Sequence, residues 1–234
     1  MQAFTTLDAV AAPWLRDNVD TDLIIRVEPL FAGVPREALG PHALATVRFD
    51  AEGRERPEFV LNQPRYRGAG ILLAGANFGC GSSREGAVWA LLGLGIRCVV
   101  APSFGDIFQS NCYQNGLLPV VLPADRVRTL ADFVAGPGGP RLRVDLEQCT
   151  VAPATDAAQE GLAPEPFHIP RRRREGLLRG LDELALTLAD SARIDAWQAR
   201  TRTLRPWLLL EPSAAPPQPH DGATPPHSNS GDLP

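Results

Sequence analysis

The sequence predicts an α/β fold in which a mostly parallel sheet is flanked by helices. Between residues 70 and 122, short apolar runs of strand length alternate with longer stretches of helical pattern. A glycine-rich loop, residues 75–86, separates the first apolar run from the first helical stretch. The chain has 234 residues, of which 44% are hydrophobic, and this suffices for one good-sized buried core. Strands and helices that alternate in this way are typical of a parallel sheet.

The first quarter of the chain contains one strand and a long irregular segment. Alternating apolar and polar residues predict an opening strand within residues 1–16. Residues 16–25 then bring three acidic side chains to a turn. Prolines interrupt the segment from residue 26 to residue 63, where we expect loops and short helices that wrap over the site.

The central block is the most regular part of the sequence. We expect strands at residues 70–74, 97–101 and 117–122 and helices at residues 85–94 and 103–115. Ser103 is the expected N-cap of the second helix, and Gly116 is expected to end it. Ligands of such sheets bind where strand ends meet helix N-termini, which is where the glycine-rich loop lies.

The last part of the chain predicts a helix at residues 123–135, a strand at 141–151, a loop at 152–166 and a final helix at about 190–203. An arginine run, residues 171–174, is expected to be the solvated start of another helix, with a contact to an acidic partner as the alternative. We expect residues 1–205 to form one domain. Residues 211–234 are rich in Pro, Ser, Ala and Gly and predict a disordered tail.

The glycine-rich loop carries the strongest signal for binding. Gly79 and Gly81 permit backbone conformations that other residues avoid, so the loop can turn sharply and present its N–H groups. Ser82 or Ser83 is expected to cap the following helix, whose unpaired N–H groups and neighbouring Arg84 favour a carboxylate or phosphate. The alternative is purely structural, because Ser82 and a glutamate three residues later have the spacing of a capping box.

Composition excludes several classes of function. We find neither an apolar run long enough to span a bilayer nor a basic secretory start, and we therefore expect a cytoplasmic protein with no membrane role. The net charge of -4 argues against general nucleic-acid binding. All 23 basic residues are arginines, and the absence of lysine excludes Schiff-base chemistry and a Walker-type phosphate loop.

The cysteines do not predict a metal site in this chain. Cys80, Cys98, Cys112 and Cys149 are widely spaced and include no Cys-x-x-Cys pair, so neither a zinc site nor a complete iron–sulfur ligand set is encoded. Most are expected to be buried thiols, while Cys80 lies in the glycine-rich loop and is expected to pack or to line the site.

Several blocks of sequence together resemble one family. They are residues 18–22, 77–85, 101–108, 115–119 and 180–188, which include Asn-Val-Asp-Thr-Asp, Asn-Phe-Gly-Cys-Gly-Ser-Ser-Arg-Glu and Gly-Leu-Asp. In type and order they resemble the small subunits of 3-isopropylmalate dehydratase, which are similar to the swivelling domain of aconitase. The resemblance implies a β/β/α swivelling domain that closes over an active site built mainly by a large subunit.

The resemblance also implies a reaction and its cofactor. A 2-alkylmalate loses water and regains it the other way round, giving the 3-alkylmalate of leucine biosynthesis. The family's 4Fe-4S cluster is held by cysteines of the large subunit, where iron acts as a Lewis acid on the leaving hydroxyl. The implied partners are thus a cluster-bearing large subunit and a small dicarboxylic hydroxy acid.

Site residues follow from the matched motifs. Ser82 would be the general base that takes the carbon-bound proton, stabilised as an anion by Arg84 and the loop N–H groups. Ser83 and Arg84 would hold substrate carboxylate oxygens, with Gly81 and Asn77 completing the binding loop. Asp22 matches an active-site carboxylate that orients a proton-transfer group, whereas Asp20 and Thr21 shape the turn.

Departures from the family pattern keep other substrates and functions open. Gly86 replaces the usual His after Ser-Ser-Arg-Glu, Arg26 replaces a Pro, and Arg179 stands where Asn is common. Because Arg26 and Arg179 add cations, a related alkylmalate or a homoaconitate-type substrate is an alternative, as is a regulatory subunit of this fold. A dinucleotide-binding module fits poorly, because Arg84 occupies the third glycine position and the strand at 97–101 ends without an acidic residue.

Overall fold

The computed structural model describes residues 1–81, 84–137, 139–154 and 162–208. By compactness the chain divides into two units, Met1–Leu188 and Ala189–Pro234. The first unit contains the sheet and the matched motifs. The described part of the second unit consists of α9 (Ser191–Leu204) and the short 3-10 helix η6 (Pro206–Leu208). The predicted tail at residues 211–234 and the predicted domain end at residue 205 are not tested, because the tail lies outside the described residues.

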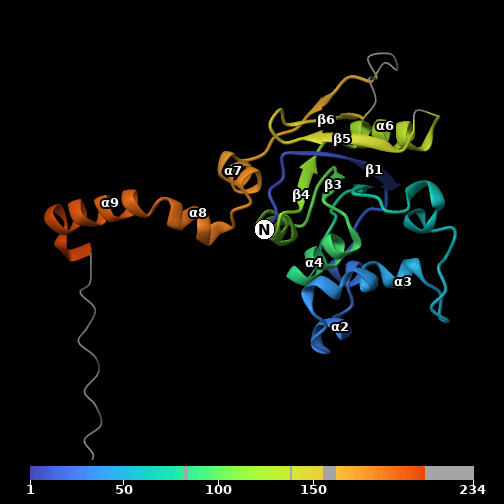
Figure 1. Cartoon of the computed structure of the whole chain (residues 1–234), viewed down its shortest axis with the longest axis horizontal. Coiled ribbons are helices and arrows are strands. Elements are labelled where there is room, and N and C mark those ends of the chain that lie inside the picture. Colours follow the sequence, from blue (N-terminus) through green and yellow to red (C-terminus); the bar gives the residue numbers. More distant parts are fainter. Residues whose placement is uncertain (82–83, 138, 155–161, 209–234) are drawn as a thin grey trace, which may run out of the picture. The chain divides into compact units, whose positions relative to one another are not determined.

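The first unit is built on one mixed sheet (Figure 1). Its strands, in the order in which they lie side by side, are β4 (Leu118–Val121), β3 (Cys98–Ala101), β2 (Ile71–Ala74), β1 (Thr6–Trp14), β5 (Arg141–Asp145), β6 (Thr150–Pro153) and β7 (Glu165–Pro166). The pairs among β4, β3, β2 and β1 are parallel, whereas β5, β6 and β7 continue the sheet in antiparallel pairs. The predicted parallel sheet is confirmed for the regular block and β1.

Helices cover both faces of the sheet. The α-helices described between residues 1 and 189 are α1 (Thr21–Ile24), α2 (Val27–Phe31), α3 (Ala45–Arg48), α4 (Glu85–Leu94), α5 (Asp106–Asn115), α6 (Ala124–Ala135), α7 (Arg171–Arg179) and α8 (Glu183–Ala189). Four 3-10 helices, η1 (Arg36–Ala38), η2 (Gly40–His42), η3 (Val60–Asn62) and η4 (Pro64–Tyr66), complete the irregular segment. The expectation of short helices between residues 26 and 63 is confirmed.

The alternation of side chains along the strands separates two apolar layers. Leu72 and Ala74 of β2 pack with α4, whereas Ile71 and Leu73 of the same strand pack with α6. Because successive side chains of a strand point to opposite faces, a fully buried strand contributes to both layers. All four residues of β2 are completely buried, which holds the strand and the loop that follows it in a fixed position.

Three details of the sequence prediction were wrong. The expected strand at 141–151 is a hairpin, β5 and β6, whose turn is closed by a hydrogen bond from Gln148 N to Asp145 Oδ1 at 2.7 Å. The helix expected from Ser103 begins at Asp106, with Gly105 as its N-cap, although Gly116 ends it as predicted. The expected loop at 152–166 contains β7.

The arginine run starts α7 as predicted, but it is not solely a solvated surface. Arg174 donates from Nε to Leu146 O at 3.0 Å and from Nη2 to Glu147 O at 2.7 Å. Arg173 pairs with Glu183. These contacts attach α7 to the β5–β6 turn and to α8, so half of the run stabilises the fold.

Candidate functional site

The site is built from loops that follow neighbouring parallel strands. The acidic turn follows β1, the glycine-rich loop follows β2, and residues 102–105 follow β3. Because the carboxyl ends of parallel strands lie at one edge of a sheet, these loops are neighbours in space. Backbone hydrogen bonds join the first two: Gly79 N donates to Val19 O at 2.7 Å, and Thr21 N donates to Cys80 O at 3.0 Å.

Asn77 connects all three loops. Its side-chain amide donates from Nδ2 to Asn18 Oδ1 of the acidic turn at 2.9 Å. Its backbone N–H donates to Ser103 Oγ at 2.8 Å. Ser103 therefore anchors the glycine-rich loop instead of capping α5. Asn77 also has a φ of +59°, a left-handed conformation that asparagine tolerates better than most residues.

The two predicted loop glycines occupy conformations that require glycine. Gly79 has a φ of +74° and Gly81 a φ of +88°. A Cβ atom on Gly79 would lie 2.2 Å from Phe108 Cγ, so the loop backbone rests directly on the aromatic ring of α5. The sharp turn predicted from these residues is confirmed.

Asp22 and Arg84, both predicted to be catalytic, form an ion pair between Arg84 Nη1 and Asp22 Oδ1. Asp20 is the N-cap of α1, where its Oδ1 accepts from Leu23 N at 2.7 Å. This capping bond is the structural role predicted for Asp20, and it leaves Asp22 to project from the first turn of α1. The Asp22 side chain is 56% exposed and that of Arg84 is 24% exposed, so the pair lies at an open, partly desolvated position.

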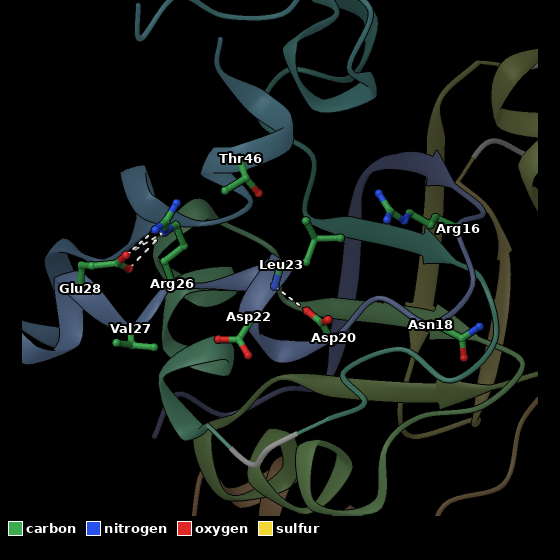
Figure 2. Close-up of a pocket in the computed structure, with 9 residues that line it drawn as sticks. All are labelled: Arg16, Asn18, Asp20, Asp22, Leu23, Arg26, Val27, Glu28 and Thr46. Atoms are coloured by element: carbon green, nitrogen blue, oxygen red, sulfur yellow. Dashed lines mark hydrogen bonds and ion pairs between the residues drawn. The ribbon is translucent and has the colours of Figure 1, made fainter. Parts of the chain in front are cut away.

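A cavity of about 480 Å³ opens beside Asp22 of this pair (Figure 2). It is lined by Arg16, Asn18, Asp20, Asp22, Leu23, Arg26, Val27, Glu28 and Thr46. This volume falls within the range of small-molecule sites, and the mixture of cations, carboxylates and amides suits a small polar acid.

Arg26 and Glu28 form a second ion pair at the rim of the cavity (Figure 2). Arg26 Nε lies 3.1 Å from each carboxylate oxygen, and Nη2 also donates to Oε1. The hydrogen bond from Arg26 lowers the pKa of Glu28 to about 2, and the more distant charge of Arg84 contributes in the same direction. Glu28 is therefore a carboxylate throughout the physiological pH range.

The structure brings together most of the predicted site. Asp22 and Arg84 are in contact, and Asn77 and Gly81 lie on the loop beside them. Ser82 and Ser83 lie outside the described residues, so their predicted roles remain predictions.

The predicted serine cap of α4 is wrong. The N-cap is Arg84, and its side chain makes no capping bond. Glu85 Oε1 accepts from Asn115 Nδ2 at 2.8 Å, a bond across to α5.

Sequence reasoning missed three polar residues that line the cavity: Arg16, Glu28 and Thr46. For Glu28 a signal was present, since an Arg-x-Glu pair directly follows the acidic turn. Thr46 comes from α3, and nothing in the local pattern placed that short helix over the site.

The described residues do not fit a metal cluster. Within them, His, Cys, Asp and Glu side chains nowhere gather in threes in a way that could hold a metal ion. Burial raises the pKa of the Cys98 and Cys112 thiols, which disfavours the thiolate that iron requires. Over the same part of the chain, no helix has both the length and the apolar character needed to cross a membrane.

Comparison with known families first defines the class of fold to which this chain belongs. Residues 1–125 match the aconitase C-terminal domain, which confirms the predicted swivelling-domain fold. A crystal structure of a 3-isopropylmalate dehydratase from Methanocaldococcus jannaschii is similar in fold, with a TM-score of 0.55 at 24% identity, over 82% of this chain and 99% of that one. The fold is thus that of the aconitase swivelling domain.

Curated relatives make the assignment narrower. The 3-isopropylmalate dehydratase small subunit of Rhodospirillum centenum is 50% identical over 209 residues, which are 89% of this chain and 100% of that protein. The small subunit of the same name from Phenylobacterium zucineum is 49% identical over 89% of this chain and 98% of its own length. The chain belongs to the family of 3-isopropylmalate dehydratase small subunits.

Proposed function

We propose that this chain is the small subunit of a heteromeric hydro-lyase that interconverts 2-isopropylmalate and 3-isopropylmalate in leucine biosynthesis. The observation that carries the proposal is identity of about half to relatives of this name over their full length. The ion pair of Asp22 and Arg84 beside a cavity supports it, because those residues were predicted from the family motif alone.

The reaction removes a proton from one carbon and a hydroxide from its neighbour. The electrons of the broken C–H bond form the double bond of the unsaturated acid, and the C–O bond breaks with its electrons on the hydroxide. Water then returns with proton and hydroxyl exchanged between the two carbons. The chain therefore has to supply a proton acceptor and to hold at least one substrate carboxylate.

In this proposal Arg84 binds a substrate carboxylate. Its guanidinium already binds the carboxylate of Asp22, and a planar fork of donors suits a substrate carboxylate equally well. Once Arg84 holds the substrate, the role of Asp22 is to orient the group that transfers the proton. Ser82 Oγ is the proposed proton acceptor, with Ser83 as a further contact to substrate oxygens.

A serine hydroxyl is a very weak base, so this role depends on stabilisation of its anion. Arg84 supplies positive charge two residues away in the sequence, and Gly81, held in its left-handed conformation beside Cys80 and the acidic turn, aims the loop. The hydrogen bonds of Asn77 to both neighbouring loops fix that geometry before substrate arrives.

We assign the 4Fe-4S cluster of the reaction to the large subunit. When bound there, it supplies the Lewis acid that assists departure of the hydroxyl. The poor fit of the described Cys, His and acidic residues to a metal supports this assignment. We expect the reaction to take place in the cytoplasm, since all four cysteine thiols are unpaired, as in reducing compartments.

The structure favours an uncharged alkyl side chain on the substrate. The two cations that suggested an additional carboxylate are both neutralised within the chain. Glu28 pairs with Arg26, and Glu175 pairs with Arg179 at 2.9 Å on α7. The related alkylmalate and homoaconitate-type substrates are tested as competitors in the same assay.

The proposal is tested by reconstitution with a cluster-bearing large subunit under anaerobic conditions. Formation of the unsaturated acid from 2- and 3-isopropylmalate is followed by absorbance. We expect turnover only with both subunits and the cluster, and the fastest turnover with the isopropyl substrates. Turnover by this chain alone would contradict the proposed function. So would a lack of turnover when both subunits and the cluster are present.

Ser82→Ala tests the base within that assay. We expect kcat to fall by about two orders of magnitude or more, the usual contribution of a general base, with unchanged assembly. Ser110→Ala is the matched control, since Ser110 lies on α5 outside the cavity that we describe. Near-normal turnover by Ser82→Ala would exclude this role for Ser82.

A further inference from the structure

Helix α2 packs against the start of α4, close to Arg84. A Cβ atom on Gly86 would lie 2.8 Å from Leu30 Cδ2, so the missing side chain at Gly86 leaves room for Leu30. Leu30 is two residues from Glu28 in α2, and Gly86 is two residues from Arg84. This contact sets α2 against the start of α4, and Glu28 of α2 lines the same cavity as Asp22, the partner of Arg84.

Electrostatics agree with that placement. The charge of Arg84 acts on the Glu28 carboxylate and helps to lower its pKa. Arg84 itself is bound to Asp22. Asp22 thus binds the guanidinium that we assign to the substrate, and Glu28, which lines the same cavity as Asp22, is close enough for the charge of Arg84 to act on it.

Arg26 binds both carboxylate oxygens of Glu28. Three donor–acceptor contacts join the two side chains, and both oxygens of Glu28 accept from Arg26 Nε. Both side chains are 60% exposed, and exposed ion pairs contribute little to folding stability. A bidentate pair at the rim of the cavity therefore has its main effect on where the Glu28 carboxylate lies.

We propose that Arg26 is a positioning residue that holds Glu28 away from Arg84, so that a substrate carboxylate can bind there. Without Arg26, Glu28 turns to Arg84 and competes with the substrate for the same donors. The inference rests on the proposed function, because it takes Arg84 as a ligand of the substrate carboxylate.

Kinetics of the reconstituted holoenzyme provide the first test. Arg26→Ala is expected to raise KM about tenfold with little change in kcat, since it affects binding and not the proton transfer. The double variant Arg26→Ala/Glu28→Gln is expected to restore KM, because a neutral amide does not compete for Arg84. Arg54→Ala is the matched control: Arg54 pairs with Asp50 and Glu52 outside the cavity, and its loss leaves KM unchanged.

A second test needs no turnover and separates this inference from the proposed function. The ¹⁵N NMR signal of Arg84 Nε in the isolated chain is expected to shift in Arg26→Ala and to return in the double variant. An inactive wild-type holoenzyme would end the proposed function, while this signal would still decide the position of Glu28. An unshifted signal, or a KM that the double variant leaves high, would overturn the role of Arg26.

Discussion

At the scale of single residues, the site depends on how closely the glycine-rich loop approaches α5. Gly79 combines a left-handed φ with direct contact to the Phe108 ring. Phe108 itself is buried and packs edge-on against Phe78, with ring centroids 5.6 Å apart. Because the loop rests on this aromatic cluster, its backbone cannot move without disturbing the packing of the core.

Gly79→Ala is therefore expected to destabilise the fold more than an alanine at a comparable glycine. Gly68 is the matched control, because its φ of +73° is nearly that of Gly79 while nothing lies within 4 Å of an added Cβ. The backbone strain of about 1–2 kcal/mol is common to both, and contact with Phe108 adds roughly 1–3 kcal/mol at Gly79 alone. Urea unfolding measures the difference. An equal loss of unfolding free energy in the two variants would mean that the Phe108 ring can move aside without destabilising the fold.

How far the sequence predicts the site is also decided residue by residue. Asp22, Arg84, Asn77 and Gly81 were identified because their type and order match a family motif. The serine cap of α4 was wrong because the helix begins at Glu85, which makes Arg84 its N-cap. The bond from Asn115 to Glu85 joins residues thirty positions apart, and no local pattern reveals it.

At the scale of elements, α4 and α5 are joined by the side chain of Asn115. Asn115 Oδ1 accepts from Trp89 Nε1 at 2.9 Å, and Nδ2 donates to Glu85 Oε1 at 2.8 Å. Arg36 of η1 donates to the same Oδ1 and stacks on the Trp89 ring, 5.0 Å from its centroid. Since Asn115 is 7% exposed, these bonds form largely out of contact with water.

Asn115→Ala is expected to destabilise the chain by about 1–3 kcal/mol, the cost of leaving buried partners without their hydrogen bonds. The neighbouring Gln114 is exposed, and Gln114→Ala serves as the control. Thermal and urea unfolding measure both variants. If Asn115→Ala loses no more stability than Gln114→Ala, water must replace the hydrogen bonds of the Asn115 amide.

The sheet shows which elements a sequence can reveal. The parallel strands were predicted because each is a short apolar run next to a helical pattern. The β5–β6 hairpin was missed because its two strands join through only four residues, and its turn depends on a side-chain bond to Asp145 and a φ of +54° at Cys149. Such a turn carries no glycine or proline signal.

At the scale of the whole molecule, the chain is longer than its relatives. The small subunit from Rhodospirillum centenum is matched over its full length by 89% of this chain. The compact unit ends at Leu188, whereas the sequence predicts a domain that ends at residue 205.

Two truncations locate the boundary that matters for function. Deletion of residues 211–234 is expected to leave the melting temperature and the activity with the large subunit unchanged, because its composition predicts no packed structure. Deletion of residues 189–234 also removes α9, which lies within the predicted domain, and is expected to lower both. If the longer deletion is equally harmless, the functional domain ends at Leu188.

Strand β1 has a consequence for how the chain is made. Its second half, Ala11–Trp14, pairs with β2, whereas its first half, Thr6–Val10, pairs with Arg141–Asp145 of β5. On the ribosome, that first half is therefore an open strand edge until β5 emerges, and open edges invite pairing with other chains. Asp8, which binds Arg141 at 2.7 Å and Arg143 at 3.4 Å in the folded protein, is during synthesis an unpaired charge on that edge. We therefore expect the carboxylate that pairs with both arginines in the finished sheet to disfavour edge-to-edge association of the growing chain.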